Sequence, residues 1–147
     1  MPVIKSKNFT LRPYKKSDEK SLILNINNKK IYRNMSRVPY PYTSKDANEW
    51  ITQTFKKAKK KESNEVNFAI AVAGEVAGGI SLFDISGHKA EIGYWLGENY
   101  WGQGIMSAAC KLVTKFGLEK LKLIRIYAFV FPWNKASMKV LRWAYFG

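Results

Sequence analysis

The segment 97–107 contains the residue types of a phosphate-binding loop. Gly102 and Gly104 stand one residue apart, between the end of a predicted strand and the start of a predicted helix. The first N–H groups of a helix have no partner within the helix and carry a partial positive charge, so a helix start suits an oxyanion. Because glycine has no Cβ, a phosphate could approach the amides of Gln103, Gly104 and Ile105 closely. The spacing alone fits an ordinary glycine-containing helix start equally well.

A glutamate within an apolar strand is the second candidate for chemistry. Glu91 lies in the predicted strand 90–96, where apolar neighbours would desolvate its carboxylate and raise its pKa toward the value that a general base needs at neutral pH. The alternative is a solvated or ion-paired strand residue. The chain has one cysteine and one histidine, so neither an internal disulfide nor a multi-cysteine zinc site is expected, and Cys110 is predicted to pack in the core.

These candidates need elements that hold them in place, and the sequence predicts such elements along the whole chain. Apolar residues that alternate with period two predict strands, and apolar residues at helical spacing predict amphipathic helices. Strands are predicted at 9–13, 68–73, 76–85, 90–96 and 124–131. Helices are predicted from Ser17 to about Asn27, from Thr43 or Ser44 onward, from about Gly102 to Leu121, and from Asn134 to about Ala144.

The order of these elements predicts an α+β fold, which some schemes class as α/β, with one mixed, mainly antiparallel sheet flanked by helices. The helix 102–121 connects the strands 90–96 and 124–131 as a crossover, so these two strands should form a parallel pair. No linker or repeat divides the chain, and residues 1–147 are interpreted as a single domain. With 46% hydrophobic residues, this domain can bury a core of its own.

The net charge of +14 comes from 25 Lys and Arg against 11 Asp and Glu. Nucleic acid, an anionic membrane surface or an acidic small molecule would each fit such a balance. Of the basic residues, 20 are Lys, whereas base readout and phosphate clamping favour Arg, so specific nucleic-acid binding is not the preferred interpretation. The first residues lack the apolar stretch of a signal peptide and no apolar run reaches membrane-span length, so a cytoplasmic protein without membrane contact is expected.

Five segments together point to a known family. They are Leu11-Arg12-Pro13, Pro39–Tyr42, Glu91–Leu96, Tyr100–Gly104 and Phe131–Ser137. In this order they resemble the GNAT superfamily of acyl-CoA-dependent N-acetyltransferases, specifically its RimJ/RimL-like branch, over nearly the whole chain. The resemblance implies a GNAT fold in which the parallel strands 90–96 and 124–131 are splayed apart. It also implies acetyl-CoA as the co-substrate and no metal ion.

The resemblance assigns residues to acetyl-CoA. In the family, a signature of the form QxxGxG wraps the pyrophosphate at the start of the long helix. It matches Asn99–Gly104 here, with Asn99 in place of the usual Gln or Arg. The pantetheine arm pairs with the first splayed strand like an added strand, and the asparagine that binds its amides matches Asn134, which also suits an N-cap. The residues implied for acetyl-CoA are Trp95, Leu96, Gly97, Gly102, Gln103, Gly104, Ile105, Met106 and Asn134.

The resemblance also assigns catalytic roles. Glu91 matches the general base, which takes a proton from the amine directly or through a water. Ser137 matches the serine proposed in the RimL-like branch to donate to the thiolate leaving group, and its alternative role is to cap the last helix. The tyrosine that other members use as the acid corresponds to Leu141 here. The residues implied for the acceptor pocket are Arg33, Tyr40 and Tyr42.

The function predicted from these observations is direct transfer of an acetyl group from acetyl-CoA to a primary amine, on a protein N-terminus or a small molecule. Two alternatives stay open, namely a non-catalytic acyl-CoA-binding or regulatory domain and a ribosome- or RNA-associated module. Family members carry two further strands after the last helix, so the chain is expected to be a C-terminally short domain. The strand 124–131 would then be an apolar edge, with either a homodimer through that edge or an incomplete acceptor site.

Overall fold

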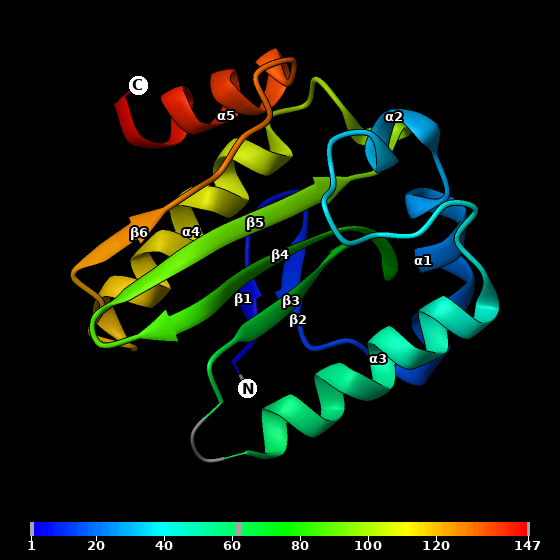
Figure 1. Cartoon of the computed structure of the whole chain (residues 1–147), viewed down its shortest axis with the longest axis horizontal. Coiled ribbons are helices and arrows are strands. Elements are labelled where there is room, and N and C mark those ends of the chain that lie inside the picture. Colours follow the sequence, from blue (N-terminus) through cyan, green and yellow to red (C-terminus); the bar gives the residue numbers. More distant parts are fainter. Residues whose placement is uncertain (1, 61–62, 147) are drawn as a thin grey trace.

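The computed structural model describes residues 2–60 and 63–146, and it shows one curved sheet with helices on both faces (Figure 1). The strands are β1 (Ile4–Lys5), β2 (Thr10–Arg12), β3 (Val66–Val72), β4 (Glu75–Ser86), β5 (Lys89–Leu96) and β6 (Arg125–Tyr127). The α-helices are α1 (Glu19–Ile26), α2 (Lys29–Tyr32), α3 (Ser44–Lys59), α4 (Ile105–Glu119) and α5 (Lys135–Phe146), and two short 3-10 helices are η1 (Lys16–Asp18) and η2 (Glu98–Tyr100).

The sheet keeps its strands in chain order from β1 to β6. Every neighbouring pair is antiparallel except β5 and β6, which are parallel and are connected through α4. This arrangement confirms the predicted α+β fold with a mixed, mainly antiparallel sheet and a parallel pair near its end. The two-residue strand β1, which pairs Ile4 with Leu11, was not predicted because so short a segment carries no periodic pattern.

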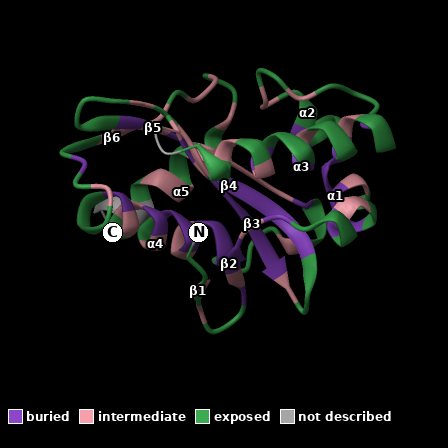
Figure 2. Cartoon of the chain, turned by 90° about the horizontal axis from the view of Figure 1, so that it is seen from below, coloured by how far each residue is buried: buried purple, intermediate pink, exposed green. Residues whose placement is uncertain are grey.

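The two faces of the sheet bury separate apolar clusters. On one face, α4 packs Val113 against strand residues such as Phe68, and on the other face α1 and α3 form a second cluster around Leu22. Figure 2 shows the buried residues concentrated in the central strands and along α4. Because successive side chains of a strand point to opposite faces, β5 serves both clusters, with Ile92 in the first and Trp95 against the second. Within the described residues, no helix is both long and apolar enough to cross a bilayer.

The strand predicted over 124–131 is wrong in its length. β6 pairs with β5 at three positions only, and Glu91 is the last β5 residue in that pairing. Beyond it, Phe131 stacks on Trp133 with ring centroids 4.7 Å apart, and the indole N–H of Trp133 donates to the carbonyl of Arg33 at 3.3 Å. The two parallel strands thus diverge after Glu91, and the chain beyond β6 is held by contacts outside the sheet.

The predicted starts of the helices agree with the structure in some cases and differ from it in others. α3 begins at Ser44, one of the two predicted starts, and Thr43 is its N-cap and forms a capping box. Ser17 is not an N-cap, because it lies inside η1 and α1 begins only after Asp18, whose carboxylate bonds elsewhere. The long helix begins at Ile105, later than predicted, because the left-handed conformation of Gly104 interrupts the helical geometry before it.

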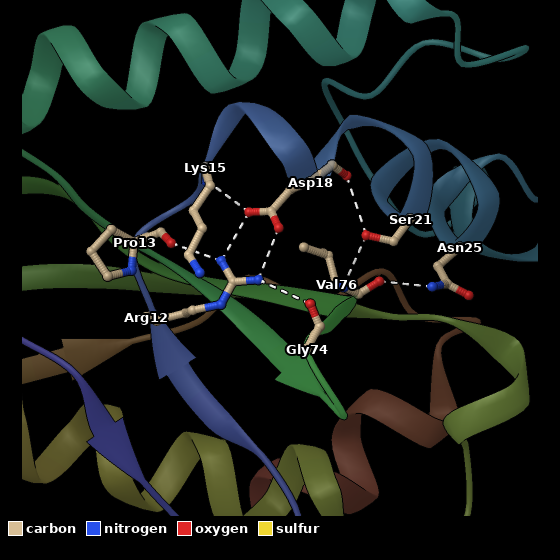
Figure 3. A network of polar contacts seen from close by, with 8 residues as sticks. All are labelled: Arg12, Pro13, Lys15, Asp18, Ser21, Asn25, Gly74 and Val76. Carbon is tan, nitrogen blue, oxygen red and sulfur yellow. Dashed lines mark hydrogen bonds and ion pairs between the residues drawn. The ribbon is translucent and has the colours of Figure 1, made fainter.

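A buried ion pair ties the first strands to the α1 face (Figure 3). The guanidinium of Arg12 contacts both oxygens of the Asp18 carboxylate at 2.9 and 2.8 Å, and it also donates to the carbonyl oxygens of Pro13 at 3.0 Å and Gly74 at 3.4 Å. The Asp18 carboxylate accepts a further bond from the backbone N–H of Lys15 at 2.7 Å. This network fixes β2, η1 and the β3–β4 hairpin relative to one another.

Candidate active site

The chain between β5 and α4 folds into a loop that its own hydrogen bonds hold. The indole N–H of Trp101 turns back and donates to the carbonyl of Leu96 at 2.7 Å, and the side-chain amide of Gln103 donates to the carbonyl of Asn99 at 3.2 Å. The carboxylate of Glu98 accepts bonds at 2.9 and 2.7 Å from side chains at the start of α2. The loop is therefore anchored both to the end of β5 and to the α1–α2 region.

Gly102 and Gly104 give this loop its shape. Their φ angles are +76° and +77°, a left-handed conformation that other residues rarely adopt. A Cβ on either glycine would meet no atom within 4 Å, so open space lies where side chains would stand. Gly104 is the N-cap of α4 without a capping side chain, and its carbonyl accepts from Ala108 at 3.2 Å. The N–H groups of residues 105–107 thus have no partner within the helix, and such donors beside open space fit a phosphate group.

Two of the residues predicted to bind acetyl-CoA, Ile105 and Met106, have buried side chains and present their backbone to a ligand. The side chains of Ile105 and Met106 are buried in the core, at 4% and 6% exposure. The side chain of Gln103 already bonds to the loop itself. The N–H groups at the start of α4 are therefore the main donors that these positions offer to a ligand.

The end of β5 directs only alternate residues toward the gap between β5 and β6. The N–H of Gly97 donates to the carbonyl of Ala77 in β4 at 2.7 Å. Because successive backbone groups of a strand turn to opposite edges, Gly97 and Trp95 direct theirs toward β4, whereas Leu96 and Tyr94 direct theirs toward the gap. Of the three residues predicted for the pantetheine arm, only Leu96 directs its backbone toward the gap, and its carbonyl there already accepts the indole N–H of Trp101.

Glu91 lies where β5 and β6 part, on the same face of the sheet as Trp95. Burial raises the pKa of its carboxyl, the nearby carboxylate of Asp84 raises it further, and Arg37 opposes both effects. Asp84 comes close because β4 bulges across residues 83–86, where Asp84 adopts a φ of +50°. The desolvation expected from the sequence is confirmed, and the second carboxylate is a contribution that the sequence did not reveal.

The last helix brings Ser137 onto the side chain of Tyr94. Asn134 accepts a hydrogen bond from the N–H of Ser137 at 3.1 Å, so it caps α5 as predicted. The Tyr94 hydroxyl is hydrogen-bonded to Ser137 Oγ, a contact in which either oxygen can donate, and the Ser137 carbonyl lies 3.3 Å away as a second acceptor for the Tyr94 proton. Sequence reasoning did not select Tyr94 as a site residue, and the only available signal was its position on β5, on the face opposite to Glu91.

The residues predicted for the acceptor pocket divide into two accessible and one buried. Tyr42 is 7% exposed, and its hydroxyl donates to the carbonyl of Asp46 at 3.5 Å, so Tyr42 belongs to the core beneath α3 rather than to an open pocket. Tyr40 and Arg33 are exposed beside α2. Trp133, which sequence reasoning did not select, joins this region through its hydrogen bond to Arg33.

A comparison with known protein families shows to which family this chain belongs. The model of the acetyltransferase (GNAT) domain matches residues 8–146. The chain belongs to the GNAT acetyltransferase family. This GNAT protein is therefore an acyl-CoA-dependent N-acetyltransferase, as the sequence predicts.

Individual GNAT relatives agree with this assignment. The chain is 35% identical over 152 residues to the probable N-acetyltransferase YjcK of Bacillus subtilis, covering 98% of this chain and 83% of the relative. A shorter match, 33% identical over 79 residues, is to the putative ribosomal N-acetyltransferase YdaF of Bacillus subtilis, covering 52% of this chain and 43% of the relative.

Solved structures share the fold of this GNAT domain. RimL, a ribosomal alpha-N-protein acetyltransferase in complex with coenzyme A, superposes with a TM-score of 0.85 at 22% identity, covering 98% of this chain and 83% of that one. A putative ribosomal-protein-serine acetyltransferase from Vibrio cholerae gives 0.83 at 20% identity, covering 97% and 82%. The GNAT architecture, including its parallel strand pair, is thus established.

The cysteine of this GNAT enzyme is not suited to carry an acyl group. Cys110 is fully buried in α4, and burial raises the pKa of its thiol to about 12, so almost none of it is thiolate at neutral pH. In the described part of the chain, no three His, Cys, Asp or Glu side chains gather in a way that could hold a metal ion. The groups that the structure offers for acyl transfer are a carboxylate and hydroxyls.

Proposed function

We propose that this enzyme transfers the acetyl group of acetyl-CoA directly to the primary amine of a protein N-terminus, with Glu91 as the general base. The observation that carries the proposal is the loop at the end of β5. Its left-handed Gly102 and Gly104 and the N–H groups of residues 105–107 would hold the pyrophosphate. The pantetheine arm would then follow the gap-facing edge of β5 toward Glu91, pairing with it like an added strand.

The proposed chemistry needs one proton acceptor and one donor to sulfur. The amine nitrogen attacks the thioester carbon, the C–N bond forms, and Glu91 takes the proton that the amine loses. The C–S bond breaks with its electron pair on sulfur, which leaves as a thiolate and takes a proton from water. Ser137, in the first turn of α5, would donate a hydrogen bond to that sulfur and is polarised by the helix N-terminus. The raised pKa of Glu91 supports its role as the base.

A protein N-terminus is the acceptor that the surroundings of Glu91 support best. The carboxylates of Glu91 and Asp84 favour the approach of a single ammonium group, whereas the net charge of +14 disfavours a polycationic amine. Exposed Tyr40 and Arg33 beside α2 leave room for a chain that continues outward. Three of the similar proteins described above also carry names of ribosomal acetyltransferases.

The test is an acceptor screen with matched peptides. One set carries a free N-terminus and an internal lysine, and the other carries the same sequence with a blocked N-terminus. We expect CoA release and acetylation of the free set only. Acetylation of the blocked set, or of small diamines alone, would overturn the N-terminal assignment. If acetyl-CoA at 100 times its Kd stabilises the chain by about 2.7 kcal/mol yet no amine is acetylated, the non-catalytic alternative holds.

A further inference from the structure

Tyr94 joins the gap between the parallel strands to the last helix. Its backbone faces the gap, and its ring packs against the apolar cluster beneath α4. From there the phenol reaches Ser137, to which it is bonded at both the hydroxyl and the carbonyl oxygen. Ser137 is in turn held through its own N–H by the side chain of Asn134 at 3.1 Å. Asn134 therefore holds the backbone of Ser137, and Tyr94 contacts its hydroxyl.

The proton count of this pair decides what Ser137 can do. A tyrosine hydroxyl has one proton, and a serine hydroxyl has one proton and two acceptor lone pairs. Either hydroxyl can donate across the Tyr94–Ser137 contact, and the Ser137 carbonyl, 3.3 Å from the Tyr94 oxygen, is a second acceptor for the Tyr94 proton. When Tyr94 shares its one proton between that carbonyl and Ser137 Oγ in a three-centre bond, the serine keeps its own proton for a different partner. Hydrogen bonds in such a chain strengthen one another. Ser137 then becomes a better donor than an isolated serine.

The location of the pair fits a sulfur that lies in the gap. Glu91 and Tyr94 are three residues apart on β5, about 10 Å at the usual rise per residue, and their side chains point to opposite faces of the sheet. A thioester threaded through the gap would thus have the carboxylate on the side from which the amine arrives. It would have the two hydroxyls on the other side, toward α4 and α5.

We propose that Tyr94 is a positioning residue, which orients the Ser137 hydroxyl so that it donates to the departing sulfur. This inference rests on the proposed acetyl transfer. The proton of the attacking amine goes to Glu91, the electron pair of the broken C–S bond stays on sulfur, and the thiolate takes its proton from water. Tyr94 and Ser137 keep their protons throughout. Their contribution is to stabilise the negative charge that develops on sulfur.

The sharpest test measures the thiolate itself and needs no acceptor. CoA bound to the protein is titrated by the ultraviolet absorbance of its thiolate, for the wild type, Tyr94→Phe, Ser137→Ala and the double variant. We expect the wild type to lower the thiol pKa by about one unit through a hydrogen bond to a charged group. Tyr94→Phe should abolish most of this shift, and the double variant should match Ser137→Ala. The control is Tyr32→Phe, since Tyr32 is 45% exposed and no side-chain hydrogen bond of its hydroxyl is found within the described residues.

Steady-state kinetics complete the test. Tyr94→Phe should lower kcat about tenfold with KM for acetyl-CoA unchanged, and it should add nothing to Ser137→Ala in a double-mutant cycle. A purely structural tyrosine would lower the melting temperature and give additive effects. If CoA binds and Tyr94→Phe leaves both the thiol pKa and kcat at wild-type values, the inference is refuted while the proposed function stands. If wild-type protein does not bind CoA, the proposed function itself fails. Should Tyr94→Phe not fold, an unchanged thiol pKa in Ser137→Ala refutes the inference equally.

Discussion

Replacing Gly104 with alanine separates phosphate binding from backbone strain, because the chain contains a matched control. Gly104 has a φ of +77° and Gly74 has a φ of +82°, and a Cβ on either would meet no atom within 4 Å. Gly74 lies in the β3–β4 hairpin and not in the loop before α4. An alanine at either site therefore has the same steric freedom and the same left-handed backbone, which costs about 1–2 kcal/mol.

The expected results follow from these two positions. For a domain of this size each kcal/mol lowers the melting temperature by about 2–4 °C, so both Gly104→Ala and Gly74→Ala should lose roughly 2–8 °C. In Gly104→Ala the new methyl group also enters the space proposed for the pyrophosphate. Loss of one charge-assisted hydrogen bond, about 1.5–3 kcal/mol, would weaken CoA binding by about 10- to 100-fold.

The assay is isothermal titration of CoA into both variants below their melting temperatures. An affinity for CoA that falls in Gly104→Ala and stays at the wild-type value in Gly74→Ala is the expected outcome. Equal affinities in the two variants would refute the assignment of the loop as a phosphate cradle, since strain is common to both.

Three further predictions concern the base, the ion pair and the sheet edge. Glu91→Gln should keep the affinity for CoA and lower kcat by about 100-fold. Because the pKa of Glu91 is raised and a base must be deprotonated, the activity of the wild type should begin to fall at a pH above the usual range of a glutamate as the pH decreases. An activity that does not change with pH would contradict the role of Glu91 as the base. Asp18→Asn leaves the guanidinium of Arg12, whose side chain is only 10% exposed, without its charge partner. The free energy of unfolding, measured with urea, should fall by about 3–5 kcal/mol. A decrease below about 1 kcal/mol would show that the ion pair is not needed for stability. Ile124 and Phe129, 79% and 80% exposed beside β6, should let the chain self-associate at tens of micromolar; light scattering that gives a monomer would exclude this.

Much of the site could be predicted from the sequence because it depends on local rules. A glycine at position 102 or 104 is what a left-handed φ requires, and the apolar spacing after Ile105 requires a helix there. Thr43 caps α3 through atoms three residues away. Period-two alternation along β5 was enough to place Glu91 and Tyr94 on opposite faces of the sheet. Each of these outcomes depends on interactions within a few residues.

The parts that the sequence did not predict depend on contacts between distant segments. β-branched and aromatic residues favoured a long strand over 124–131, yet its pairing with β5 ends at Tyr127, and the chain that follows contacts Arg33, 100 residues away, through Trp133. Tyr42 has the amphipathic character of a pocket residue, but the packing of α1 and α3 buries it.

The sequence by itself thus determined the order of the elements, the glycine loop and the carboxylate on β5. The tertiary structure alone decided where β5 and β6 part and which hydroxyl meets Ser137. It also brought a second carboxylate, that of Asp84, near Glu91. The physical reason is the distance along the chain over which each kind of interaction acts. Backbone preferences and alternation act over a few residues, whereas a contact such as that of Tyr94 with Ser137, 43 residues apart, depends on how the sheet curves and how α5 packs on α4.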